Sequence, residues 1–175
     1  MFPQIPFTPG TTKVTGFSAE IGKKFVDKDG NTYVLNKLHT ALLADVTADG
    51  HVMFYATDGV ATNVAASAED TTNPRFAGIA MGATAESVGT DAATVYYDLH
   101  LVNGRKTGVK CAASVAIGDG LTTSTPGTAT DAEAQRMTKA TTTALAYHAW
   151  GAGFIGVAVS AVASGTCTAT IRGNL

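Results

Sequence analysis

Charge is scarce in this sequence. Charged residues make up 15% of the 175 residues, and the formal net charge at pH 7 is −2, whereas about 25% is usual for a globular domain. Binding to the phosphates of nucleic acid requires a basic surface, so the composition predicts no nucleic-acid partner. A surface with so few charges is typical of a protein that packs against neighbouring proteins.

Cysteine and long apolar runs are also in short supply. The two cysteines, Cys111 and Cys167, are too far apart in sequence for a metal knuckle or a disulfide framework. They could pair with each other, but we expect buried free thiols. The chain lacks the run of about twenty apolar residues of a membrane span and the basic start of a secretory signal. We therefore expect no membrane partner.

No motif for catalysis or cofactor binding is convincing. The glycines of residues 151–156 have the letters G-x-G-x-x-G, but β-prone residues follow where a dinucleotide site needs a helix. These glycines are expected to serve packing. Residues 27–31 begin like a calcium loop, but a hairpin turn explains them better. Asp98 and His100 share one face of an expected strand, as a solvated or interface pair rather than a catalytic dyad. We expect no enzymatic activity, no cofactor and no metal.

What the sequence does contain is a series of short β-prone segments separated by turns. Two of them flank Asp29-Gly30, a dipeptide suited to a tight hairpin turn. The pattern predicts a mainly β protein built from small antiparallel β-sandwich or barrel units. One short helix is expected over residues 132–140, after a capping box at Thr130 and Glu133. The expected strands cover residues 25–26, 32–35, 51–57, 93–102, 153–162 and 166–171.

A weak internal repeat indicates how these segments are organised. RFAGIAMGATA (residues 75–85) resembles GFIGVAVSAVA (residues 153–163), which suggests two related β units. We therefore divide the chain into an extended arm and a β body that contains both units. The boundaries are 1–20 for the arm and 21–175 for the body, with units at about 21–110 and 111–175.

The arm opens with MFPQIPFTPG, in which a proline at every third position prevents an interior helix and favours extended geometry. It is either a disordered end or a segment that docks on another surface, and its apolar residues favour docking. Burying three apolar side chains returns less free energy than ordering ten residues costs, so docking also needs main-chain hydrogen bonds. The expected partner-binding residues are Phe2, Pro3, Ile5, Pro6 and Phe7.

Three stretches resemble the head decoration proteins, or capsid cement proteins, of tailed bacteriophages. They are PRFAGIAMGA (74–83), VAIGDGLTTSTPGTAT (115–130) and FIGVAVSAVASGTCTATI (154–171), and the resemblance runs from about Gly22 to the C terminus. It implies a structural protein on the outer capsid surface of a virion, made in the host cytoplasm. Such a protein binds the major capsid protein, commonly as a homotrimer, and stabilises the capsid lattice.

The resemblance does not include the arm, whose role as the capsid contact follows from the physical argument alone. An alternative function is that of a β-rich receptor- or glycan-binding module of a phage tail or fibre. In that case four aromatic residues would form a sugar platform, namely Tyr96, Tyr97, Tyr147 and Trp150.

Overall fold

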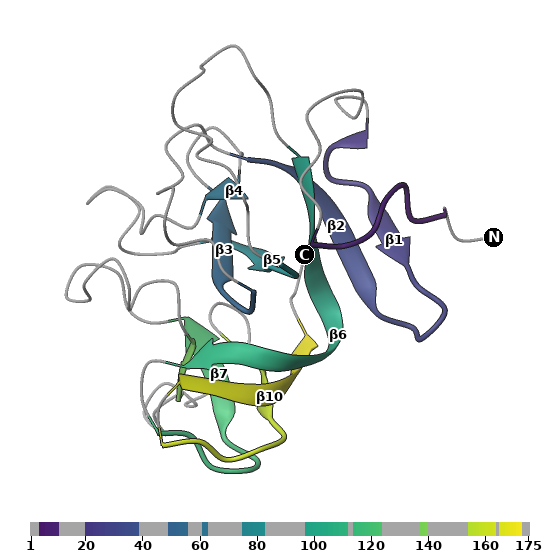
Figure 1. Ribbon diagram of the computed structural model, residues 1–175. Helices are drawn as coiled ribbons and strands as arrows, with labels where there is room; N and C mark the ends of the chain where they lie inside the picture. Colours follow the sequence, from purple (N-terminus) through teal and green to yellow (C-terminus); the bar gives the residue numbers. More distant parts are fainter. Residues whose placement is uncertain are drawn as a thin grey trace.

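The computed structural model is built from β-strands (Figure 1). It describes residues 4–10, 20–38, 49–55, 61–62, 75–82, 97–111, 114–123, 137–139, 154–163 and 165–172. The strands are β1 (Lys24–Val26), β2 (Thr32–Lys37), β3 (Val52–Tyr55), β4 (Ala61–Thr62), β5 (Arg75–Ile79), β6 (Tyr97–Cys111), β7 (Gly120–Thr123), β8 (Met137–Lys139), β9 (Phe154–Ala158) and β10 (Gly165–Arg172). Within these ranges no helix has the length and apolar character needed to cross a bilayer.

The centre of the fold is β6, a strand of 15 residues with different partners along its length. Its first half pairs antiparallel with β2, where Leu35 lies opposite Leu99. Its second half pairs antiparallel with β10, from Asn103 to Cys111. Figure 1 shows β6 running between β2 and β5 and then turning toward β7 and β10. One strand therefore joins the two ends of the molecule.

The remaining strands extend the sheet along both edges of β6. The path runs β10-β9-β7-β8-β6-β5-β3-β4, and the β1–β2 hairpin adds to β6. Strand β8 meets β6 at one residue pair, Met137 with Cys111, and this pairing is parallel. The other strand pairs are antiparallel. The prediction of a mainly β, antiparallel protein is confirmed.

The predicted helix is wrong where the structure describes it. Met137–Lys139 form β8, with Thr138 opposite Thr122 of β7. The local sequence after the capping box favours a helix. In the folded chain, however, the backbone N–H and C=O groups of residues 137–139 are satisfied by pairing with β7, and this pairing outweighs the local helical preference. Residues 130–136 and 140 lie outside the described ranges.

Several other predictions from the sequence are confirmed. The β1–β2 hairpin forms around Gly30, and β3, β9 and β10 occupy the expected segments. The two repeated stretches supply β5 and β9, and each places a glycine against a neighbouring strand. A Cβ at Gly78 would come within 2.5 Å of the His100 Cβ, and one at Gly156 would collide with the Thr170 carbonyl oxygen. Gly156 therefore serves close packing, as expected, and Gly78 does the same. Gly151 and Gly153 lie outside the described residues.

The main buried apolar cluster draws on strands from both ends of β6. Leu35, Ile79 and Leu99 belong to it from one end, and Leu121 and Ile171 belong to it from the other. All five side chains are completely buried. Burying an aliphatic side chain of this size contributes about 1.5–3 kcal/mol, so this shared cluster is a major source of stability for both ends.

Candidate functional site

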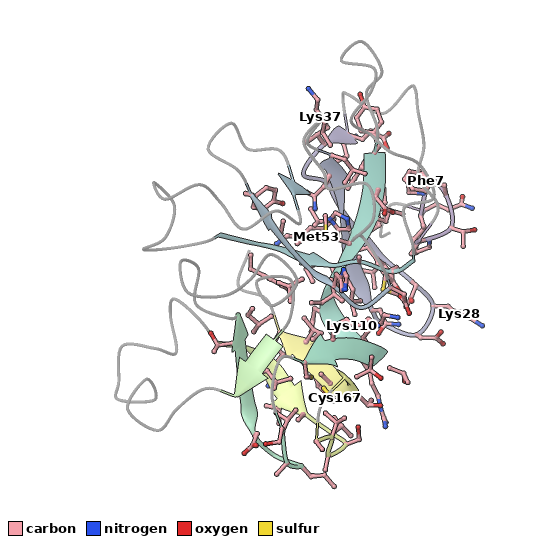
Figure 2. The ribbon with its side chains drawn as sticks, turned by 60° about the vertical axis from the view of Figure 1, so that its left-hand side comes forward. Phe7, Lys28, Lys37, Met53, Lys110 and Cys167 are labelled. Atoms are coloured by element: carbon pink, nitrogen blue, oxygen red, sulfur yellow. The ribbon has the colours of Figure 1, made fainter. Side chains whose placement is uncertain are left out.

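The described part of the N-terminal arm, Gln4–Gly10, lies on the body of its own chain. Ile5 and Phe7 are half-buried and pack against the main apolar cluster, whereas Gln4 and Thr8 are exposed. Figure 2 shows Phe7 on the same side of the molecule as the β1–β2 hairpin. Of the five predicted contact residues, the structure therefore places Ile5, Pro6 and Phe7 on the body surface. Phe2 and Pro3 lie outside the described ranges, and contact with a partner stays a prediction.

The arm crosses the segment after β5 at a point where two backbones touch. A Cβ on Gly10 would lie 2.5 Å from the carbonyl oxygen of Met81, and a Cβ on Gly82 would lie 2.6 Å from that of Gly10. Real Cβ atoms do not approach backbone so closely, so this crossing requires glycine on both sides. The root of the arm is thus fixed to the body.

A buried carboxyl group receives the arm at this crossing. The Asp98 side chain accepts hydrogen bonds from the backbone N–H groups of Gly10 and Leu99, the latter at 2.7 Å. Asp98 is 1% exposed. Burial raises the pKa of Asp98 to about 7, because desolvation outweighs the opposing effect of these two bonds. The arm is therefore attached to a carboxyl group that titrates near neutral pH.

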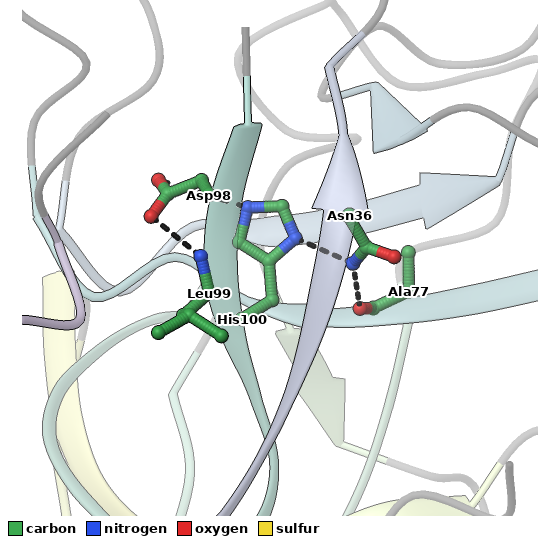
Figure 3. Close-up of polar contacts among 5 residues, drawn as sticks. All are labelled: Asn36, Ala77, Asp98, Leu99 and His100. Carbon is green, nitrogen blue, oxygen red and sulfur yellow. Dashed lines mark hydrogen bonds and ion pairs between the residues drawn. The ribbon is translucent and has the colours of Figure 1, made fainter. Parts of the chain in front are cut away.

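His100 lies beside Asp98 in a neutral state. The Asn36 amide nitrogen donates to the Ala77 carbonyl oxygen at 2.9 Å and lies 2.8 Å from His100 Nδ1 (Figure 3). His100 Nδ1 therefore accepts, which assigns the ring proton to Nε2. That buried Nε2 has no hydrogen-bond partner and lies 3.9 Å from Asp98 Oδ2. Complete burial lowers the pKa of His100 to about 3.

The polar contacts continue from His100 to β3. The Tyr55 hydroxyl donates to Asn36 Oδ1 at 2.8 Å, so polar side chains connect β3, β2 and β6 in succession. Because each hydrogen bond requires one relative position of the strands, this network holds β3 in place relative to β2 and β6, with which it does not pair. The network has a structural role, because the side chains of Asn36, Asp98 and His100 are all at least 99% buried.

The expectation of a solvated or interface Asp98–His100 pair is wrong, because both side chains are buried inside the chain itself. This face is covered because β5 approaches His100 at Gly78 and the arm approaches Asp98 at Gly10. Neither approach is visible in the alternating pattern of the strand itself. Gly78 and Gly10 were the sequence signal for this burial, since each of these glycines marks a close backbone contact.

The other candidate sites are also explained by structure. The two oxygens of Asp27 accept hydrogen bonds from the Asp29 and Asn31 backbone, the Asn31 amide and the Tyr33 hydroxyl. This is the predicted hairpin turn. No group of three metal-ligating side chains occurs among the described residues. Tyr97 is 5% exposed and cannot present its ring to a sugar. The remaining residues of the sugar platform (96, 147 and 150) lie outside the described ranges.

Comparisons with known proteins give one structural likeness. No family model and no curated protein matches the sequence. A similar solved structure is the N-terminal base of the head fiber protein gp8.5 of bacteriophage phi29. It has 16% sequence identity and a TM-score of 0.47, over 82% of this chain and 98% of that chain. At this identity and TM-score the likeness establishes neither a shared fold nor a shared function.

Proposed function

We propose that this chain is a structural virion protein that binds the outer surface of a phage capsid and stabilises the lattice of the major capsid protein. The observation that carries the proposal is the docked arm, which presents a strip of half-buried apolar residues and prolines (Ile5, Pro6, Phe7 and Pro9). The low charge of the chain and the three stretches that resemble capsid cement proteins support the same function.

The docked position of the arm bears on how such a contact would form. A free ten-residue tail loses its conformational freedom when it binds, whereas a segment already held on the body has lost much of it beforehand. The capsid contact is therefore a preformed strip on the body surface rather than a tail that reaches outward. Binding only to the assembled lattice stabilises that lattice by mass action.

Arm removal tests the contact. Deleting residues 2–8 retains Gly10, the donor to Asp98, and is expected to abolish co-sedimentation with capsids that lack this protein. Thermal melting checks that the body still folds without the packing of Ile5 and Phe7. The matched control is Ile117→Ser, which removes a 72% exposed apolar side chain outside the arm and is expected to leave binding intact. Full binding by the folded deletion variant would exclude the arm as the contact.

Abundance in virions tests the structural role separately. Quantitative mass spectrometry of purified virions is expected to find hundreds of copies per particle, as a lattice-binding protein requires. We also propose that the chain forms a homotrimer, for which light scattering would give three times 17.8 kDa. A few copies per particle would favour the tail or fibre module instead, and absence from virions would contradict the proposal.

A further inference from the structure

The two cysteines are adjacent in the folded chain although 56 positions separate them in sequence. Cys111 is the last residue of β6, and Cys167 is the third residue of β10. The Sγ atoms are 2.9 Å apart, and the side chains are 0% and 2% exposed. Figure 2 places Cys167 at the lower end of the view, among the strands near the C terminus. Both thiols are free.

The two thiols are in direct contact. Either sulfur can donate the hydrogen bond between them, and the Cys111 Sγ also lies 3.6 Å from the Val109 carbonyl oxygen. The thiolate is the reactive form of cysteine, and a thiol that donates to its neighbour favours the neighbour's thiolate. Either cysteine can therefore react first, and the other is in place to resolve it.

We propose that Cys111 and Cys167 form a redox modification site, at which a peroxide converts the two thiols into an intrachain disulfide. The thiolate of one cysteine attacks one peroxide oxygen and breaks the O–O bond, which leaves a sulfenic acid and a hydroxide ion. The hydroxide takes up the proton that this thiol had released and becomes the first water. The sulfur of the other cysteine then attacks the sulfenic sulfur, forms the S–S bond and releases a second water. In total the thiols lose two electrons and two protons, and one hydrogen peroxide becomes two water molecules.

Access to the buried pair comes from the end of the strand. Gly165, which pairs with Cys111, and Thr166 are exposed, and Cys167 follows them directly. Strand ends open locally far more often than the whole protein unfolds, and opening of residues 165–167 at the start of β10 would let solvent reach the Cys167 sulfur. Hydrogen peroxide is small enough to use such an opening. The site does not depend on the proposed capsid function.

Oxidation has a measurable consequence for stability. The disulfide would close a loop that spans residues 111–167 and would link the last strand to the central one. Cross-linking a loop of this length constrains the unfolded chain, and a rise in Tm of about 5–15 °C is expected for a domain of this size.

The test uses the purified, folded protein treated with hydrogen peroxide. The expected result is a mass lower by two hydrogen atoms, loss of both titratable thiols, a peptide map that links Cys111 to Cys167, and the higher Tm. Dithiothreitol is expected to reverse all four changes. Retention of both thiols by the folded protein, under conditions that oxidise the unfolded protein, would overturn the proposal.

The single variants Cys111→Ser and Cys167→Ser are the matched controls. With one sulfur left, peroxide is expected to add oxygen to it without a gain in Tm. Peroxide-treated wild type that gains oxygen, or that forms disulfide-linked dimers instead of the intrachain bond, would also overturn the proposal. The wild-type mass decides the question even if a variant fails to fold.

Discussion

Replacing Asp98 with asparagine is expected to make the protein more stable at pH 8. Asparagine keeps the shape of the side chain and an acceptor oxygen for the Leu99 N–H group, but it carries no charge to bury. The pKa of Asp98 is raised from 3.8 to about 7 in the folded state. A shift of about three units, at about 1.36 kcal/mol each, sets an upper limit of about 4 kcal/mol on the gain.

The gain is expected to depend on pH in a defined direction. Between about pH 4 and 7 the folded wild type binds a proton at Asp98 that the unfolded chain does not, so this group makes stability fall as pH rises. His100 has the opposite effect, because its folded pKa is lowered to about 3 and stability rises with pH up to about 6.5. Of these two contributions to the pH dependence of stability, the Asp98→Asn variant retains only that of His100. Urea unfolding over this pH range should therefore show the advantage growing from near zero at pH 4 to its full value above pH 7.

Asp27→Asn is the matched control of opposite sign. Burial tends to raise the pKa of Asp27, but hydrogen bonds from Asn31, Tyr33 and Asp29 together lower it. This carboxylate therefore stabilises the fold above its unfolded pKa and loses that effect as pH falls. At pH 7 its replacement is expected to cost about 1–3 kcal/mol, because several donors lose a charged acceptor. Effects of the same sign for Asp27→Asn and Asp98→Asn at pH 8 would contradict this account.

Among the glycines that the structure describes, replacing Gly50 with alanine is expected to be the most destabilising change. Gly50 has a φ of +85° and joins two parts of the sheet, donating to the Ala80 carbonyl at 2.9 Å and accepting from the Lys110 N–H at 3.0 Å. A Cβ there would collide with the Gly108 carbonyl group. Because backbone cannot move aside without breaking these bonds, we expect a loss of about 3–5 kcal/mol in urea unfolding.

Gly30→Ala separates the collision from the backbone strain. Gly30 has nearly the same φ, +82°, but a Cβ there would meet nothing within 4 Å. Its replacement should cost about 1–2 kcal/mol, the usual penalty of the left-handed region. Equal losses for Gly30→Ala and Gly50→Ala would show that the contact between Gly50 and Gly108 adds nothing.

The sequence was sufficient to predict part of the local structure of this fold, namely β1, β2, β3, the start of β6, β9 and β10. Alternating apolar residues and Asp-Gly turns identify strands because both signals lie within a few residues of each other, as in the β1–β2 hairpin around Gly30. Strand β8 was missed for the same reason. Its local preference is helical, and its pairing depends on β7, which lies in a different part of the chain.

The candidate site depended on contacts that no local pattern encodes. The arm was predicted to dock on another protein, whereas the structure places its described part on the body of its own chain. The contacts that hold it there involve Met81 and Asp98, far from Gly10 in sequence. Burial of Asp98 and His100 follows from that docking and from the approach of β5. The proximity of Cys111 and Cys167 likewise follows from the register of β10 on β6, which sequence spacing does not reveal.

Strand β6 pairs with β2 along its first half and with β10 along its second half, and this arrangement has a consequence for the order of folding. The second half of β6 obtains its long antiparallel partner only when β10 is present, more than fifty residues later in the chain. Pairings between such distant segments form slowly, because a large loop must close first. A nascent chain that ends before Gly165 therefore exposes an unpaired strand edge, and such edges promote association with other chains. Chaperone contact during synthesis is expected to persist until β10 has emerged.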